Sequence, residues 1–135
     1  MTADGLITGQ SHHGFSETRD RLVSAITENG MAVLARIDHA GAAATVGLVL
    51  RPTEMVMFGN PKAGTLLMQV SPTMGLDLPL KALVWEDANG MAWLTYNDPH
   101  WLAARHGLGS QATNTLSAMT DGLAKIARHV LGAQT

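Results

Sequence analysis

A lysine, a tyrosine and a carboxylate fall on one face of the most clearly predicted hairpin. Asn89-Gly90 stands between two apolar stretches, which is a strong signal for a two-residue β-turn. With that turn, strand alternation places Lys81 and Tyr96 on the same face, and Asp77 lies further along it. Such groups beside apolar side chains are suited to binding an anion or to transferring a proton. A surface or interface salt bridge with a packed tyrosine is the alternative, and we weight it above catalysis.

A second candidate site lies where a predicted strand runs into a helix. Asn60-Pro61 requires one extended residue and then supplies a preformed first helical position, so unpaired backbone N–H groups collect there. Lys62 and Thr65 add a charge and a hydroxyl group to this helix start. The segment is suited to holding an anion, but any strand-to-helix junction needs the same features for capping. We give the two interpretations equal weight.

The histidines form no metal signature. His100 and His106 are six residues apart, which puts them on different sides of a helix, and the chain has no cysteine. His39 follows Asp38 at the end of a predicted central strand, where loops often carry function. His39 is therefore a ligand-binding candidate, with a packed or capping role as the alternative. The sequence has no local motif for an activated serine, a dinucleotide or calcium, so it indicates no metal and identifies no cofactor.

The first half of the chain supplies the elements around His39. A strand is predicted before Ser16, which is a good N-cap for a helix, and Asn29-Gly30 provides the left-handed stop of that helix. Residues 31–37 form a short apolar stretch that is typical of a central strand. Asp38 can cap an alanine-rich turn that runs to residue 44.

The second half of the chain completes an α+β fold. Its last helix is the clearest, because apolar side chains recur there at intervals of three and four residues and form one core-facing stripe. The order of elements predicts an antiparallel sheet covered on one face by helices. The expected elements are strands over 46–50 and 55–58, a helix over 62–70, hairpin strands over 78–86 and 91–97, a helix over 98–105 and the long helix over 116–130.

Composition limits the classes of function. The chain has 135 residues, enough for one domain (residues 1–135) with its own core. Charged residues make up only 15% of the chain, so its surface is either covered by small neutral residues or partly buried against a second copy, and we favour the second copy. The net charge of −2 provides no basic surface for nucleic acid or an anionic membrane.

The cellular compartment follows by default. The first ten residues lack the positive and apolar regions of a secretory signal, and no uncharged apolar stretch reaches the roughly 18 residues of a membrane span. We therefore expect a cytoplasmic protein.

Four motifs together resemble the family called domain of unknown function 302. They are Asp38-His39-Ala40, Phe58-Gly59-Asn60-Pro61 with Gly64-Thr65, Asp77-Leu78-Pro79-Leu80-Lys81, and Tyr96-Asn97-Asp98-Pro99. The resemblance runs from about Phe15 to the last helix. It implies a fold similar to the TATA-box-binding-protein-like class, in β-α-β4-α order with two main helices on one sheet, and a homodimer. It brings no catalytic residues and implies no DNA binding.

Three functions stay open at this point. The first is a homodimer that binds a small anionic molecule between the Asn60 helix start and the face that carries Lys81 and Tyr96. The second is an enzyme in which Tyr96 or His39 exchanges a proton and Lys81 stabilises negative charge on a carbonyl or carboxylate substrate. The third is a structural or partner-binding dimer, in which the polar motifs are turns and caps.

Overall fold

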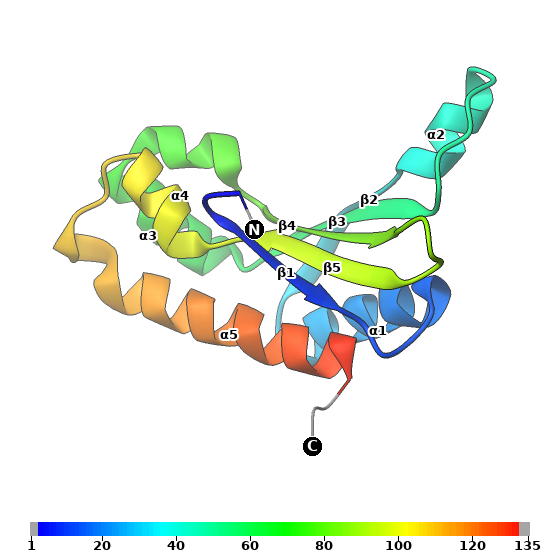
Figure 1. The fold of residues 1–135 in the computed structure, drawn as a ribbon. Coiled ribbons are helices and arrows are strands. Elements are labelled where there is room, and N and C mark those ends of the chain that lie inside the picture. Colours follow the sequence, from blue (N-terminus) through cyan, green and yellow to red (C-terminus); the bar gives the residue numbers. More distant parts are fainter. Residues whose placement is uncertain (1–2, 133–135) are drawn as a thin grey trace.

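The computed structural model describes residues 3–132 and contains one five-stranded antiparallel sheet with the order β1-β5-β4-β3-β2 (Figure 1). The predicted order of one strand, a helix, four strands and a final helix is confirmed. The strands are β1 (Leu6–Gln10), β2 (Ala32–Asp38), β3 (Thr53–Gly59), β4 (Leu80–Glu86) and β5 (Ala92–Asn97). The helices are α1 (Phe15–Glu28), α2 (His39–Thr45), α3 (Pro61–Val70), α4 (Pro99–Arg105) and α5 (Thr113–Leu131), with 3-10 turns η1 (Pro72–Asp77) and η2 (Ser110–Ala112).

The main core lies between one face of the sheet and the helices α1 and α5, which run side by side beneath it (Figure 1). Alternate residues of β3, β4 and β5 point into this core, and the apolar stripe predicted for the last helix meets them. Its largest fully buried side chain is Phe58. A smaller cluster, which includes Leu67, Met74 and Leu102, joins α3, η1 and α4 to the start of α5.

Side-chain caps fix where three of the helices begin. The Asp38 carboxylate accepts a hydrogen bond from Gly41 N at the start of α2, as the sequence predicts. Asn60 Oδ1 accepts from Lys62 N at 2.9 Å and begins α3, and Asp98 begins α4 in the same way. These local hydrogen bonds explain why these three predicted helix starts agree with the structure. The prediction of Ser16 as the N-cap of the first helix is wrong, because α1 begins at Phe15 with Gly14 as its N-cap.

The turn between β4 and β5 is one residue longer than the predicted two-residue turn. Among the described residues only glycines have positive φ, so Gly90 (φ 78°) adopts the left-handed conformation and Asn89 does not. Asp87 N donates to Met91 O, and the Asp87 carboxylate accepts hydrogen bonds from Asn89 N, Met91 N and the Trp93 indole. Three residues therefore lie in the turn, an arrangement common in hairpins with a left-handed third position.

The longer turn changes the register by one residue, so that Ala82 pairs with Tyr96 and Trp85 with Trp93. Since successive side chains alternate between faces, this shift exchanges the two faces of β5 relative to the prediction. Tyr96 lies in the core, and Lys81 lies on the opposite face of the sheet. The predicted convergence of Lys81 and Tyr96 on one face is wrong.

The segment between β2 and β3 leaves the body of the domain (Figure 1). Residues 46–50 were predicted to form a strand, and this is wrong, because they form an irregular return from α2 to β3. No residue of α2 is buried, and Val49 is fully exposed. We call residues 39–52 the arm.

Candidate functional site

An open groove lies between α3 and the first half of α5, with a volume of about 770 Å³. Its walls also include the start of β2 and the segment that joins η1 to β4. Side chains from four separate parts of the chain thus enclose one space. That arrangement and volume are typical of sites for small molecules.

The start of α3 contributes polar groups to the groove. Asn60, Lys62 and Thr65 all line the groove, so the structure brings these three sequence candidates together. Lys62 is the one charged residue among those that line it. Asn114 and Thr115 of α5 add an amide and a hydroxyl group. The positive end of the α3 dipole and the Lys62 ammonium group both favour an anion at the start of α3, where Asn60 already accepts the Lys62 backbone N–H.

The remaining walls are apolar and adaptable. Met31, Met68 and Met119 line the groove, and methionine side chains can adjust to ligands of different shapes. Gly122 of α5 also lines it, and a Cβ atom placed there would meet no other atom within 4 Å. The groove therefore suits a ligand with an apolar body and an anionic end.

Asp77 lies in a different cluster, at the junction of η1 and α4. Its Oδ2 accepts a hydrogen bond of 2.5 Å from His106 Nε2, and Arg105 Nη1 lies within 3.1 Å of both carboxylate oxygens. Burial alone would raise the pKa of the Asp77 carboxyl group, but the His106 hydrogen bond and the positive charge of Arg105 outweigh it. The positive charge of Lys81 lowers the pKa of Asp77 more weakly. The pKa of Asp77 therefore lies below its ordinary value of 3.8.

The second nitrogen of the same imidazole contacts a hydroxyl group. His106 Nδ1 is 2.9 Å from Thr73 Oγ1, and the His106 side chain is only 6% exposed. Thr73 lies at the surface, so a hydroxyl group, an imidazole and a carboxylate form a chain that ends at solvent. Sequence analysis missed Thr73, Arg105 and His106, because no local spacing connects them to Asp77.

The remaining sequence candidates lie apart from the groove and from each other. His39 is the first residue of α2, on the exposed arm. Tyr96 is 9% exposed in the main core, where burial and the negative charge of Asp98 raise the pKa of its phenol. Lys81 is partly exposed on the sheet face that α1 and α5 leave free. These three residues do not form one site.

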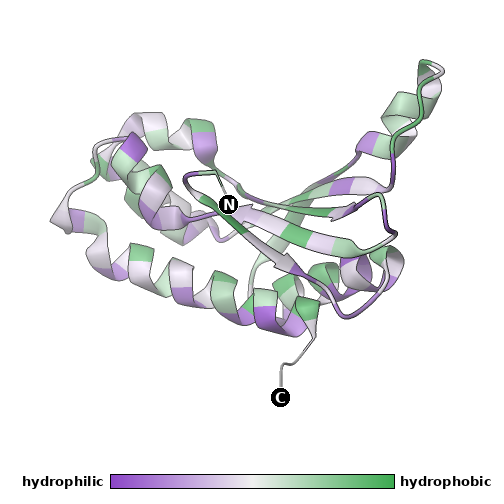
Figure 2. Cartoon of the chain, in the orientation of Figure 1, coloured by the Kyte–Doolittle hydropathy of each residue, from purple (hydrophilic) through white to green (hydrophobic). Residues whose placement is uncertain are grey.

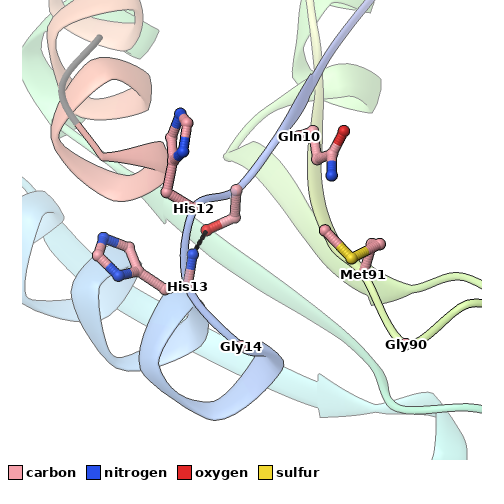
Figure 3. Close-up of a pocket in the computed structure, with 7 residues that line it drawn as sticks. Gln10, His12, His13, Gly14, Gly90 and Met91 are labelled. Carbon is pink, nitrogen blue, oxygen red and sulfur yellow. Dashed lines mark hydrogen bonds between the residues drawn. The ribbon is translucent and has the colours of Figure 1, made fainter. Parts of the chain in front are cut away.

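A smaller hollow of about 500 Å³ lies between the β1–α1 connection and the β4–β5 turn. Figure 3 shows that the rings of His12 and His13 lie on the side away from Met91. His13 N donates to Ser11 Oγ, and His13 Nδ1 pairs with Glu17 at 2.8 Å. Within residues 3–132 no three potential metal-binding side chains of His, Cys, Asp or Glu come together. The described residues of the hollow therefore form no metal-binding cluster.

Fold and groove together define a small α+β domain with a one-sided antiparallel sheet and an amphipathic groove at one end. The chain belongs to the family described as domain of unknown function DUF302, whose sequence model matches residues 7–126. An uncharacterized conserved protein of this family from Bacillus stearothermophilus has a similar crystal structure. The two structures agree with a TM-score of 0.84 at 20% identity, over 95% of this chain and 99% of that one.

Longer relatives carry a functional name. The fluoride-specific ion channel FluC 1 of Brucella suis biovar 1 is 46% identical over 128 residues, which are 95% of this chain and 50% of that protein. FluC 2 of Brucella melitensis biotype 1 is also 46% identical over 128 residues, which are 47% of its length. This chain thus spans about half the length of the curated relatives it matches. In residues 3–132, no helix combines the length and hydropathy needed to cross a membrane.

Proposed function

We propose that this domain binds a small amphipathic anion in the groove between α3 and α5. The observation that carries the proposal is the groove itself, about 770 Å³ in volume, with mostly apolar walls and, among its described lining residues, a single charged one, Lys62. An anionic head would lie at the start of α3, where the Lys62 ammonium group and the positive end of the helix dipole favour negative charge. The apolar body would extend toward Met119 and Gly122 and displace water from them.

This proposal keeps the anionic ligand predicted from the sequence but changes the residues that hold it. Lys81 and Tyr96 lie on opposite faces of the sheet and give way to Lys62, Thr65 and Asn114. The Brucella relatives are named as fluoride channels, but the segment that they share with this chain is only about half of their length. We therefore expect fluoride not to compete with the amphipathic ligand.

The proposal can be tested with 8-anilinonaphthalene-1-sulfonate, a fluorescent probe that has an apolar body and one sulfonate. We expect the probe to bind at one site per chain and to be displaced by decanoate, more strongly than by decanol. Gly122→Phe should abolish this binding, because the ring fills the open space beside Gly122. Gly122→Ala is the matched control, which should leave binding unchanged and stabilise α5 by about 1 kcal/mol.

Lys62→Ala provides the second test of the same site. This change should weaken the binding of decanoate by a few-fold and leave the binding of decanol almost unchanged. The effect is small because Lys62 is exposed, and it is selective because Lys62 acts only on the charged end of the ligand. Native mass spectrometry of the freshly purified protein would show any natural ligand that it retains. Unchanged probe affinity in Gly122→Phe would refute the groove as the site.

The Thr73, His106 and Asp77 chain supports a second candidate function, general acid–base chemistry. His106 is positioned to accept the Thr73 hydroxyl proton while Asp77 holds the other side of the ring. Gly75 and Leu78, which flank Asp77 in the sequence, line the groove, so this cluster borders one end of it. An acetyl group from p-nitrophenyl acetate should then appear on Thr73 and be lost in His106→Gln. Absence of that modification in the wild-type protein would leave the cluster with a structural role.

A further inference from the structure

The arm and the free face of the sheet are two apolar surfaces that no other segment of residues 3–132 covers. We propose that two copies of this chain form a dimer in which the arm of each copy lies on the free sheet face of the other. This proposal does not depend on the groove and concerns surfaces at the opposite side of the sheet from α1 and α5. It specifies the homodimer that the charge-poor composition favours.

The arm is too exposed to be stable without a partner surface. Val46, Leu48 and Val49 are 71%, 65% and 100% exposed, and none of the seven residues of α2 is buried. Figure 2 shows hydrophobic residues along the arm out to its tip. An isolated helix this short is marginal in water, because forming its first turn is unfavourable without packing. An ordered arm with apolar side chains therefore indicates a docking surface.

The sheet face opposite α1 and α5 offers a matching surface, which we call the free face. No helix lies over the free face in Figure 1, and the arm rises on the same side of the sheet. The sheet register places on it Met55 and Met57 of β3, Leu83 and Trp85 of β4, and Trp93 of β5. At the paired positions of the five strands on this face, Lys81 is the one charged residue.

Trp85 and Trp93 give the free face a large apolar surface that a partner can cover. Trp85 and Trp93 stack with their ring centroids 5.7 Å apart and their planes at 14°. The Trp85 indole N–H donates to Thr95 Oγ1 and the Trp93 indole N–H donates to Asp87 Oδ2. Since both N–H groups are already satisfied, covering the rings leaves no buried donor without an acceptor.

Chemistry favours a second copy over other occupants. Residues 40–50 of the arm contain no charged side chain, and the free face contains one, so the surfaces match in polarity. Membrane docking through an exposed apolar segment is usually supported by lysine and arginine around it, but Arg51 is the one arginine or lysine of the arm and Asp38 precedes the arm, so there is no basic cluster. A two-fold dimer would cover both arms and both faces by one repeated contact.

Sedimentation over a wide concentration range tests the dimer. We expect the wild-type chain to dimerise and Val49→Asp to weaken the dimer by at least about 100-fold, because the carboxylate would be buried without a partner. Val49 is fully exposed in one copy, so this change does not disturb the fold of the monomer. Leu76→Asp is the matched control, since Leu76 is 69% exposed on η1, outside both surfaces, and should leave the dimer intact.

Cross-linking tests which surface receives the arm. The natural chain has no cysteine, so Val49→Cys protein can be mixed with Leu83→Cys protein and treated with a short bis-maleimide. We expect a cross-linked pair of one chain of each kind, and no such pair when Leu76→Cys replaces Val49→Cys. A monomer at all concentrations, or a dimer that Val49→Asp does not weaken, overturns the proposal. Loss of the dimer in Val49→Asp without a 49–83 cross-link overturns the free face as the docking surface.

Discussion

The Asp77 carboxylate and the His106 imidazole, 29 positions apart in the sequence, are joined by a hydrogen bond of 2.5 Å between Oδ2 and Nε2. The bond connects η1 to the end of α4, and Ser71 reinforces the same junction by donating to His106 O at 2.9 Å. Of these two segments η1 also borders the groove, through Gly75, and Leu78 directly after it lines the groove as well. We therefore expect a substitution of Asp77 or His106 to act mainly on the stability of the fold, and to a lesser extent on the shape of the groove.

Replacing Asp77 by alanine should lower the free energy of unfolding by about 1–3 kcal/mol, because the buried His106 ring loses its acceptor and Arg105 loses its partner. Asp20→Ala is the matched control, since Asp20 is 69% exposed and pairs with Arg19 at the surface. Asp20→Ala should lower the free energy of unfolding by less than about 1 kcal/mol. Urea unfolding measures both values, and equal effects would contradict a structural role for the Asp77–His106 pair.

Lowering the pH should remove the contribution of Asp77 to the free energy of unfolding. The pKa of Asp77 is lower in the folded protein than its ordinary value of 3.8, so the folded state favours the carboxylate. This contribution is fully present above about pH 4 and is lost as the pH falls through the folded-state pKa. The difference in stability between wild type and Asp77→Asn should therefore shrink as the pH is lowered from neutral toward pH 3. A difference that stays constant with pH would contradict this assignment.

Tyr96 should ionise at a higher pH than a free tyrosine. Burial, followed by the negative charge of Asp98, raises its pKa above the ordinary value of 10.0, while Arg128 opposes them. Since Tyr96 is the only tyrosine in the chain, tyrosinate absorbance in an alkaline titration reports this group alone. The stabilisation that accompanies the raised pKa is present below about pH 10 and is lost as the pH rises through the folded-state pKa. An ordinary titration midpoint in the folded protein would place the phenol in solvent and contradict the register of β5.

The three-residue turn predicts different effects at two neighbouring positions. Gly90→Ala should destabilise the protein by about 1 kcal/mol, because φ at Gly90 is 78° and a Cβ atom is strained there. Asn89→Ala should have a much smaller effect, since among the described residues no non-glycine position has positive φ. In the two-residue turn predicted from the sequence, both positions would need positive φ. Large losses at both positions would support that shorter turn instead.

The sequence by itself determined the elements whose ends depend on local hydrogen bonds. The side chains of Asp38, Asn60 and Asp98 cap helices within three residues of their own positions, and the apolar stripe of α5 follows helical spacing. The order of strands and helices, and hence the α+β class, follows from these signals. The segment 46–50 is the exception, because its apolar side chains resemble a strand but pair with none of the strands in the part of the chain that the structure describes.

Only the tertiary structure decided which of these residues meet. The hairpin register depended on hydrogen bonds from Trp93 and Met91 to Asp87, and one residue of difference separated Lys81 from Tyr96. The Asp77–His106 pair and the groove join segments distant in sequence, whose approach is set by the packing of α3, η1 and α4 against α5. Local spacing has no information on such contacts, because many packings satisfy the same helix and strand signals and only one of them buries the common core.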